Sequence, residues 1–269
     1  MSRPSTAQSC WVVIPAYNEG ATVRDVAVRA RQHCANVIVV DDGSTDDTVQ
    51  TLAGLDIILL RNEENGGKAA SLWRGFQYAL AQGAVAVITL DADGQHAPEE
   101  IPSFFTAACQ DPGAFLIGAR QAEQRKNARC RYVANRIADF WISWAAGQRI
   151  EDSQSGFRLY PARFLRHLTL KHGRRQSFVF ESEALIEAGR KGLPCLHIPI
   201  DVAPRTGPRP SHFRPVLDIW RITAMVGMKL LTKGLYPQGL YWSLLAPCGR
   251  RVMSEQMQRH GGELLNRTS

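Results

Sequence analysis

Two carboxylates separated by one residue carry the clearest chemical signal in this sequence. Asp91 and Asp93 follow directly after residues 86–90, an apolar run that is typical of a strand buried on both faces of a parallel sheet. If the backbone stays extended through residue 93, both side chains point the same way and reach one hard cation, with the amide oxygen of Gln95 as a further ligand. The alternative is a polar loop whose two aspartates are merely solvated.

The elements around this pair follow a regular alternation. Pro98 and the two glutamates after it are typical of the first turn of a helix. Apolar runs and helical patterns predict five strands and four helices: strands at 11–15, 37–40, 57–60, 86–90 and 115–118, and helices at about 22–32, up to 52, up to 82 and from 98. This order predicts an α/β domain with a mostly parallel sheet and right-handed crossovers.

Polar turns follow the first, second and fourth of these strands. They begin at Ala16, Asp41 and Asp91, and in the second of them Ser44 precedes an acid by three residues, as in a capping box at the start of a helix. Ligands of parallel sheets bind outside the carboxyl ends of the strands. We therefore expect the three turns to meet at one crevice.

Composition narrows the classes of protein to which the chain could belong. Its 269 residues are 45% hydrophobic and 21% charged, which suits one large globular domain or slightly more. The six cysteines show no metal-binding spacing and favour a reducing compartment, hence a cytoplasmic location. The first ten residues lack the apolar segment of a secretory signal, and no run of 18 uncharged apolar residues predicts a membrane span.

The net charge of +7 is concentrated near the C-terminus. Residues 205–251 hold eight Lys and Arg side chains and one acid, Asp218, so the rest of the chain is balanced and no nucleic-acid partner is expected. From about residue 214 to 251, basic and apolar residues alternate, which predicts helices lying on an anionic membrane surface. The side chains that would anchor them are Arg214, Arg221, Lys229, Lys233, Tyr236, Tyr241 and Trp242. The alternative is a pair of amphipathic helices that cover the domain or form a homodimer contact.

Six motifs in sequence resemble those of family 2 glycosyltransferases. They are IPAYNEG, VDDGSTDDT, NGGKAASLWRG, LDADGQHAPEEIP, GAR at 118–120 and DSQSGFRLYP at 152–161. The resemblance runs from about Trp11 to Arg205 and is nearest to the dolichyl-phosphate and polyprenyl-phosphate mannosyl- or glucosyltransferases. It implies a GT-A (Rossmann-like) domain over residues 1–210, with a basic amphipathic helical region over 211–269. It also implies inverting transfer from a nucleotide-sugar with a divalent metal, Mg²⁺ or Mn²⁺.

The resemblance also implies roles for individual residues. The nucleotide-sugar would be bound by Pro15, Tyr17, Glu19, Asp42, Lys68, Asp91, Arg120 and Arg205, and the metal by Asp91, Asp93 and Gln95. Asp42 would accept a hydrogen bond from the ring N–H of uracil or guanine. Arg131 would add positive charge beside the phosphates, and Lys68 would either reach a phosphate or stabilise its loop. The segment after Arg205 departs from the Gly-Ser-Lys pattern of relatives.

The acceptor decides whether a catalytic base is needed. Asp152 is the candidate base, with Glu181 and Glu183 in reserve, and the alternative for Asp152 is a structural hydrogen bond in a buried loop. A lipid phosphate is already an anion and attacks without a base. The segments expected of polymerising relatives and of paired C-terminal membrane helices are missing. We therefore expect one sugar to pass from a UDP or GDP donor to a lipid-linked acceptor, most simply polyprenyl phosphate, at the inner face of the membrane. A hydroxyl of a glycolipid or acylated metabolite, and a nucleotide-sugar-binding protein without turnover, are the alternatives.

Overall fold

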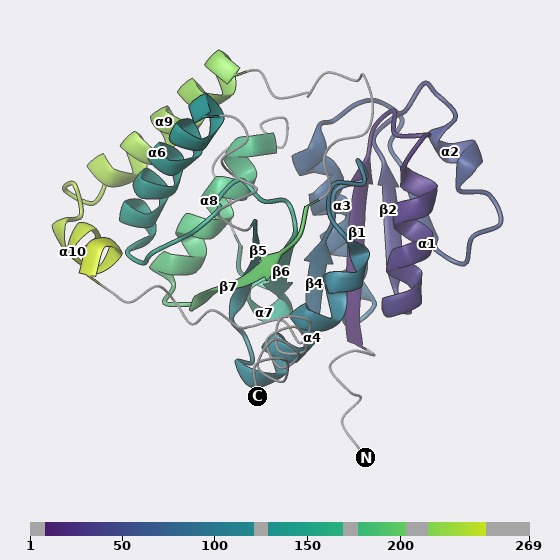
Figure 1. Ribbon diagram of the computed structural model, residues 1–269, viewed down its shortest axis with the longest axis horizontal. Helices are drawn as coiled ribbons and strands as arrows, with labels where there is room; N and C mark the ends of the chain where they lie inside the picture. The colour runs from purple at the N-terminus through teal and green to yellow at the C-terminus, as the bar shows by residue number, and fades with distance from the viewer. Residues whose placement is uncertain (1–8, 121–128, 169–176, 203–214, 246–269) are drawn as a thin grey trace, which may run out of the picture.

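A seven-stranded sheet forms the centre of the protein, and helices cover both of its faces (Figure 1). The computed structural model describes residues 9–120, 129–168, 177–202 and 215–245. The strand order is β3-β2-β1-β4-β6-β5-β7. The strands are β1 (Cys10–Ala16), β2 (Val37–Asp41), β3 (Ile58–Arg61), β4 (Ala86–Thr89), β5 (Phe115–Arg120), β6 (Arg158–Pro161) and β7 (Cys195–Ile200). All pairings are parallel except the two that β6 makes with β4 and β5.

The predicted strands are continuous apolar runs without polar alternation, because helices cover both faces of the sheet. Val12 and Val13 are adjacent in β1 and wholly buried, yet they belong to the hydrophobic clusters on opposite faces. One face is covered by α1 (Val23–His33) and α4 (Ile101–Gln110), and the other by α3 (Lys68–Ala81), α6 (Arg129–Ala146) and α8 (Ser177–Arg190). The predicted α/β architecture with a mostly parallel sheet is confirmed.

The strand β6 was not predicted, and it brings a distant loop to the carboxyl ends of the parallel strands. Its first residue, Arg158, pairs with Thr89, the last residue of β4. Because β6 runs antiparallel, the chain that enters it from residue 152 lies beside the residues that leave β4. The short α7 (Ala162–Arg166) follows β6 directly.

The expected helix after Ser44 is only one turn long, and Ser44 does not cap it but binds the turn after β1. The helix α2 covers Thr48–Thr51, and Asp47 rather than Ser44 precedes it, without a side-chain capping bond. Ser44 Oγ instead accepts a hydrogen bond of 2.8 Å from Asn18 N, which ties the turn after β2 to the turn after β1. A 3-10 turn, Pro98–Glu100, leads into α4 as expected.

The C-terminal helices pack on the domain. Four apolar side chains of α9 (Pro215–Leu231), namely Ile222, Met225, Val226 and Leu230, are buried in the same cluster as α3, α6 and α8. α10 (Pro237–Leu245) lies against α6 at the same end of the molecule (Figure 1). Within the described residues, none of the helices is both long and apolar enough to cross a membrane.

Two side chains of this region do not point outward as expected. Lys229 is buried, and its ammonium lies 3.0 Å from Glu183 Oε1 and 2.5 Å from Glu187 Oε1, both on α8. Tyr236 packs against the core, and its carbonyl oxygen accepts a hydrogen bond of 3.1 Å from Trp144 Nε1. The prediction of an outward membrane anchor is wrong for Lys229, because carboxylates of α8 bind its ammonium, and the ring of Tyr236 is half-buried against the core rather than exposed.

Candidate active site

The two aspartates of the Asp-x-Asp pair lie in a turn rather than in a strand. β4 ends at Thr89, residues 92 and 93 form a turn, and Gly94 has a positive φ of 71°. The expectation of an extended backbone through Asp93 is therefore wrong, since the chain bends before the second carboxylate. Asp93 Oδ1 accepts a hydrogen bond of 3.1 Å from Gln95 N, which places these two predicted ligands in one compact turn.

Lys68 brings together two acids that are far apart in the sequence. Its ammonium lies 2.6 Å from Asp91 Oδ1 and 3.1 Å from Glu181 Oε1. Burial lowers the pKa of Lys68, but the charges of Asp91 and Glu181 outweigh this and raise it above the ordinary value. Likewise, burial raises the pKa of Asp91 and Lys68 more than reverses this, so that Asp91 is held ionised. One ammonium is therefore shared between the first aspartate of the pair and the reserve base.

Gly156 forms the wall behind Asp91. A Cβ atom added to this glycine would lie 2.3 Å from Asp91 Oδ2, so any other residue here would displace the carboxylate. The neighbouring backbone is fixed, because Thr89 Oγ1 donates a hydrogen bond of 2.7 Å to the Gly156 carbonyl oxygen. The loop from residue 152 thus defines the space around Asp91.

The second cation of the site, Arg120, is held by Asp152. Arg120 Nε and Nη2 donate hydrogen bonds of 2.9 and 2.7 Å to the two oxygens of Asp152, and Arg120 N donates a third of 2.8 Å. The carboxylate of Asp152 is almost wholly buried. Hydrogen bonding to Asp152 raises the pKa of Arg120. Both oxygens of the predicted base thus serve to aim Arg120, the last residue of β5.

Residues that the sequence analysis did not assign hold this loop in place. Asp139 of α6 accepts hydrogen bonds from Asp152 N at 3.2 Å and Ser153 N at 2.8 Å. Arg158 is wholly buried and donates from Nη2 to the Ser153 carbonyl at 2.6 Å and from Nη1 to the Glu181 carbonyl at 2.7 Å. A signal existed for Asp139, which is the one acid in α6, but not for Arg158, which begins a short apolar strand and resembles a surface residue in the sequence.

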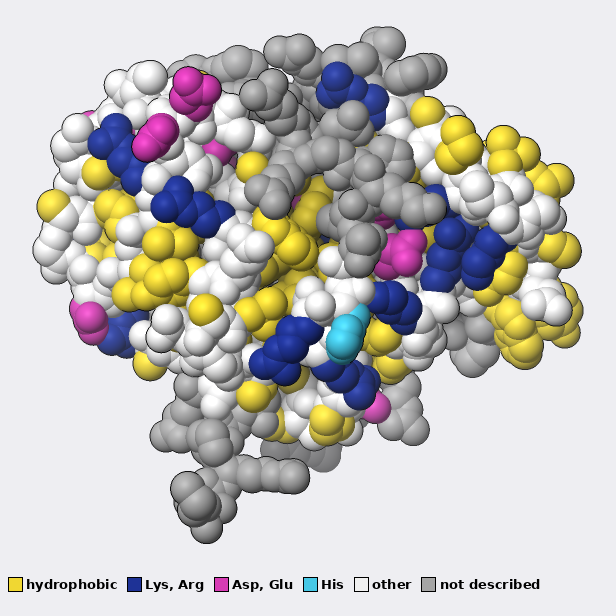
Figure 2. Space-filling model, turned by 180° about the vertical axis from the view of Figure 1, so that it is seen from behind, with side chains coloured by type: hydrophobic (Ala, Val, Ile, Leu, Met, Phe, Trp, Pro, Cys, Tyr) yellow, Lys and Arg dark blue, Asp and Glu magenta, His cyan; other side chains and the backbone are white. Residues whose placement is uncertain are grey.

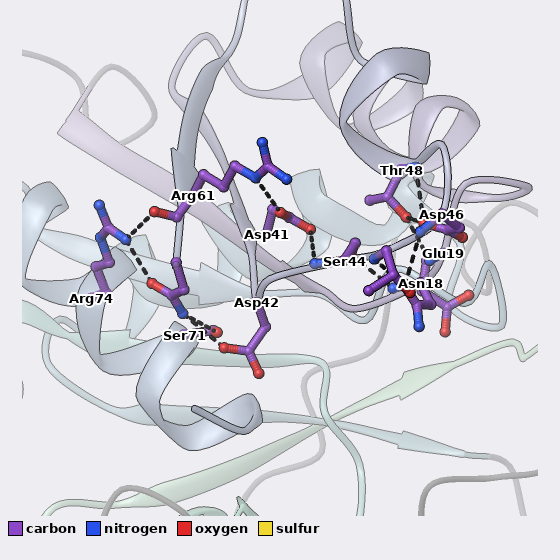
Figure 3. A network of polar contacts seen from close by, with 12 residues as sticks. Asn18, Glu19, Asp41, Asp42, Ser44, Asp46, Thr48, Arg61, Ser71 and Arg74 are labelled. Atoms are coloured by element: carbon purple, nitrogen blue, oxygen red, sulfur yellow. Dashed lines mark hydrogen bonds and ion pairs between the residues drawn. The ribbon is translucent and has the colours of Figure 1, made fainter. Parts of the chain in front are cut away.

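Asp42 lies at the centre of a separate hydrogen-bond network after β2 (Figure 3). Its oxygens accept hydrogen bonds from Asn62 Nδ2 at 2.7 Å, Gly66 N at 3.1 Å and Gly67 N at 2.8 Å. Gly67 has a φ of 87° and directly precedes Lys68, the first residue of α3. The Asp42 carboxylate therefore fixes the loop that delivers Lys68 to Asp91.

The turn after β1 is bound to the turn after β2. Glu19 N donates a hydrogen bond of 2.8 Å to Thr48 Oγ1, and Thr45 N donates one of 2.8 Å to Asn18 Oδ1 (Figure 3). Pro15 and Tyr17, which flank Ala16 at the end of β1, are half-buried. The expected convergence of the turns after β1 and β2 is thus observed.

The side chains of two predicted site residues lie outside the part of the chain that the structure describes. Arg205 falls in residues 203–214, outside the described residues, and the side chain of Arg131 is likewise not described although its backbone lies in α6. The ring of His96 is buried beside Phe157, with a centroid separation of 5.7 Å. Burial lowers the pKa of His96 despite the nearby charges of Asp91 and Asp93, so the ring is held neutral.

The residues present fit a divalent cation of the Mg²⁺ or Mn²⁺ kind. Asp91 and Asp93 supply hard carboxylate oxygens, and Gly156 lets the Asp91 carboxylate keep a position from which a side chain would displace it. The described residues contain no group of three or more His, Cys, Asp or Glu side chains that could enclose a metal by themselves. Mg²⁺ is commonly bound by one or two carboxylates together with the phosphates of a substrate, which is the arrangement that this donor set permits.

Two glycosyltransferases are similar to this chain in sequence over most of their length. The dolichyl-phosphate N-acetylglucosaminyltransferase of Methanococcus voltae, which uses UDP-N-acetylglucosamine, is 29% identical over 211 residues, 71% of this chain and 84% of that protein. The polyprenol monophosphomannose synthase of Mycolicibacterium smegmatis is 29% identical over 210 residues, 74% of this chain and 78% of that protein. The chain spans most of the length of both relatives.

Solved structures share the fold at lower sequence identity. Glucosyl-3-phosphoglycerate synthase from Mycobacterium tuberculosis, in complex with Mg²⁺ and UDP, has a TM-score of 0.61 and 19% identity, covering 82% of this chain and 79% of that one. Its complex with Mn²⁺, UDP-glucose and phosphoglyceric acid has a TM-score of 0.60 with the same identity and coverage. At this identity the likeness establishes the GT-A fold. Residues 11–175 match the glycosyl transferase family 2, and this chain therefore belongs to that family of glycosyltransferases.

Proposed function

We propose that this enzyme transfers a single sugar from a UDP- or GDP-sugar to polyprenyl phosphate at a membrane surface, with Mg²⁺ or Mn²⁺ as cofactor. One observation carries the proposal: at one edge of the sheet, Asp91 is paired with Lys68, and Arg120 is held in place by Asp152. Two carboxylates that could hold a metal ion, together with the basic side chains of Lys68 and Arg120 that could bind phosphates, suit a diphosphate leaving group.

The donor would occupy the crevice between the turns after β1, β2 and β4. Asp42 would accept a hydrogen bond from the imide N–H of uracil or guanine, a donor that adenine and cytosine lack. Pro15, Tyr17 and Glu19 would line the other side of the base and ribose. The Methanococcus relative is named for a UDP-sugar, which supports a nucleoside diphosphate donor here.

Departure of the nucleoside diphosphate would be assisted at the other end of the crevice. Asp91, Asp93 and Gln95 would hold the divalent cation, which would supply positive charge to the diphosphate as the glycosidic bond breaks. Arg120 would add a planar guanidinium to the phosphate oxygens, with Asp152 fixing its orientation. Arg131 and Arg205 would add charge from α6 and from the segment after β7.

A phosphate acceptor agrees better with the state of the two candidate bases. Asp152 accepts three hydrogen bonds from Arg120, and Glu181 is paired with Lys68, so each carboxylate already serves a cation. A lipid phosphate needs no proton acceptor, because its oxygen is already anionic and attacks the anomeric carbon directly. The names of the two relatives, a dolichyl-phosphate N-acetylglucosaminyltransferase and a polyprenol monophosphomannose synthase, support the same acceptor class.

The membrane would be met by the end of the molecule formed by α6, α9 and α10. Eleven of the fourteen large exposed apolar side chains of the described residues lie there, so this end is far more apolar than the remainder: Val133, Ile137, Phe140, Trp141, Met228, Leu231, Leu235, Tyr241, Trp242, Leu244 and Leu245. Figure 2 shows hydrophobic side chains gathered at this end, with Lys and Arg side chains beside them. α6 also carries a groove of about 540 Å³ lined by Val133, Arg136, Ile137, Phe140 and Trp141.

Liposome flotation tests this docking face. The protein should float with anionic vesicles, less so as salt rises, because basic residues near an anionic surface contribute about 1 kcal/mol each. Replacing Tyr241 and Trp242 by serine should reduce flotation strongly, and replacing Val28 and Leu59, exposed apolar residues of α1 and β3, should not. A protein that stays in the soluble fraction at low salt would contradict the membrane proposal.

The donor and metal are tested by a panel of UDP- and GDP-sugars with total lipid extract. We expect one donor to label lipid in the presence of Mn²⁺ and to stop labelling it when a chelator is added. Asp93→Asn should lower turnover by orders of magnitude with an unchanged circular dichroism spectrum, because a half-exposed turn residue contributes little packing. Undiminished labelling with the chelator and in the variant would overturn the metal assignment.

A further inference from the structure

The free enzyme carries an internal cation on the first aspartate of its metal-binding pair. Lys68 Nζ lies 2.6 Å from Asp91 Oδ1, within direct ion-pair distance, and Lys68 and Asp91 are each about one quarter exposed. An ammonium this close to a carboxylate oxygen occupies space and charge that a divalent cation bound by Asp91 would need. Two positive charges at one carboxylate repel each other strongly in such a partly desolvated place.

A second carboxylate offers the ammonium somewhere to remain. Glu181 Oε1 lies 3.1 Å from Lys68 Nζ, and the Glu181 side chain is only 6% exposed. The backbone of Glu181 is fixed, because Arg158 Nη1 donates a hydrogen bond to its main-chain carbonyl oxygen at 2.7 Å. Lys68 can therefore leave Asp91 and keep its ion pair with Glu181 on α8, so that only the contact with Asp91 breaks.

The attachment of Lys68 restricts how it can move. It is the first residue of α3, and the loop before it is held by the hydrogen bonds of Gly66 and Gly67 to Asp42. The backbone is thereby fixed while the side chain keeps four rotatable bonds, so release from Asp91 is a change of side-chain rotamer. The structure shows the ammonium bound to Asp91 and Glu181 together, and a rotamer change would leave it bound to Glu181 alone.

We propose that Lys68 is a built-in competitor of the divalent cation, holding Asp91 in the free enzyme and leaving it when the metal arrives with the nucleoside diphosphate. The released ammonium then faces the diphosphate, whose negative charge compensates for the loss of Asp91. Lys68 in this way keeps metal affinity low without nucleotide and couples the binding of the two ligands. The inference rests on the proposed metal-dependent function and adds this order of binding to it.

Titration with Mn²⁺ in the absence of nucleotide, followed by the electron paramagnetic resonance signal of free Mn²⁺, tests the inference without any activity measurement. Lys68→Met should bind Mn²⁺ about tenfold more tightly than the wild type, which corresponds to about 1.4 kcal/mol. Lys233→Met is the matched control, since it makes the same substitution at an exposed lysine. The ammonium of Lys233 lies over the ring of Tyr236 and outside the Asp42, Lys68 and Asp91 contacts, so Mn²⁺ affinity should change less than about twofold.

The wild-type protein supplies a second readout that does not depend on how well the variant folds. Acetylation of the Lys68 amine by acetic anhydride, measured by peptide mass spectrometry, should accelerate when Mn²⁺ saturates the site without nucleotide, because the ammonium then keeps Glu181 alone as its partner; the exposed Lys233 is the internal reference. Equal Mn²⁺ affinity of wild type and Lys68→Met, or a Lys68 acetylation rate that saturating Mn²⁺ leaves unchanged, would overturn the inference alone. Failure of every form to bind Mn²⁺ even with UDP would overturn the metal assignment as well.

Discussion

The guanidinium of Arg120 and the carboxylate of Asp152 form a two-pronged ion pair in which Nε and Nη2 each bond one oxygen, at 2.9 and 2.7 Å. Arg120 ends β5, and Asp152 enters the loop that leads to β6 with a positive φ of 56°. A non-glycine residue in this conformation is held there by its surroundings, here by bonds from Asp152 N and Ser153 N to Asp139. Asp152 is thus built to position Arg120.

Asp152→Asn should therefore lower stability and donor affinity together. Breaking a buried ion pair commonly costs about 3 kcal/mol or more, and Asp152 is almost wholly buried. Urea unfolding and calorimetric titration with the nucleoside diphosphate measure the two effects. A general base would behave differently, with normal stability and donor binding but loss of the acid limb in the pH dependence of transfer; that result would assign Asp152 to proton transfer.

Asp42→Asn should weaken nucleotide binding by about 1.5 to 3 kcal/mol, the range for a hydrogen bond to a charged group. It should also loosen the loop before α3, because an amide cannot accept all three bonds from Asn62, Gly66 and Gly67. Calorimetry of nucleotide binding measures the first effect and hydrogen exchange at Gly66 and Gly67 the second. Unchanged affinity together with faster exchange would move the base-binding role to another residue.

Lys229→Met should destabilise the protein by about 3 kcal/mol, because it removes the ammonium shared by Glu183 and Glu187. Lys233→Met is the matched control. Lys233 is exposed and lies 4.6 Å from the ring centroid of Tyr236, a contact worth about 1 kcal/mol or less. Both variants are measured by urea unfolding; equal stabilities would argue against α9 as an integral part of the domain.

Glu99 provides a pH-dependent test of the contact between α1 and the turn before α4. Arg29 Nε and Nη2 donate hydrogen bonds of 2.8 and 2.6 Å to Glu99 and hold its pKa below the ordinary value of 4.5. Because the pKa of Glu99 is lower in the folded than in the unfolded protein, ionised Glu99 stabilises the fold at pH values above its unfolded-state pKa. This stabilisation is lost as the pH falls through the folded-state pKa of Glu99.

Glu99→Gln should accordingly be less stable than the wild type at pH 7, by about 0.5 kcal/mol because the pair is partly exposed. The two proteins should converge well below pH 4.5, once Glu99 of the folded wild type is protonated. Thermal unfolding across this range measures the difference. A gap that persists in acid would mean that packing, and not the charge of Glu99, is responsible.

The parts of the fold that could be predicted are those with a local signal. Buried apolar runs predicted β1, β2, β4 and β5, because strands covered on both faces lack polar alternation. β6 has no such signal, since its buried Arg158 resembles a surface residue until the carbonyl groups of Ser153 and Glu181 that satisfy it are seen. Lys229 was misplaced for the same reason: its partners lie on another helix.

The candidate site was predictable in composition and much less so in its pairings. Asp91, Asp93 and Asp42 follow strands whose ends meet at one edge, so their convergence follows from topology. The pairing of Lys68 with both Asp91 and Glu181 joins three segments from different parts of the chain, and no local spacing encodes such a contact. The extended Asp-x-Asp geometry failed because Gly94 allows the chain to turn early.

The acceptor class is the central claim, and one comparison tests it directly. Purified enzyme is given its labelled donor, Mn²⁺ and either polyprenyl phosphate or the matched polyprenol, identical except for the phosphate. We predict that label enters polyprenyl phosphate alone, in a product from which mild acid releases the sugar, and that Asp93→Asn abolishes it. Transfer to the polyprenol or to a glycolipid hydroxyl, with polyprenyl phosphate inert, would contradict the account.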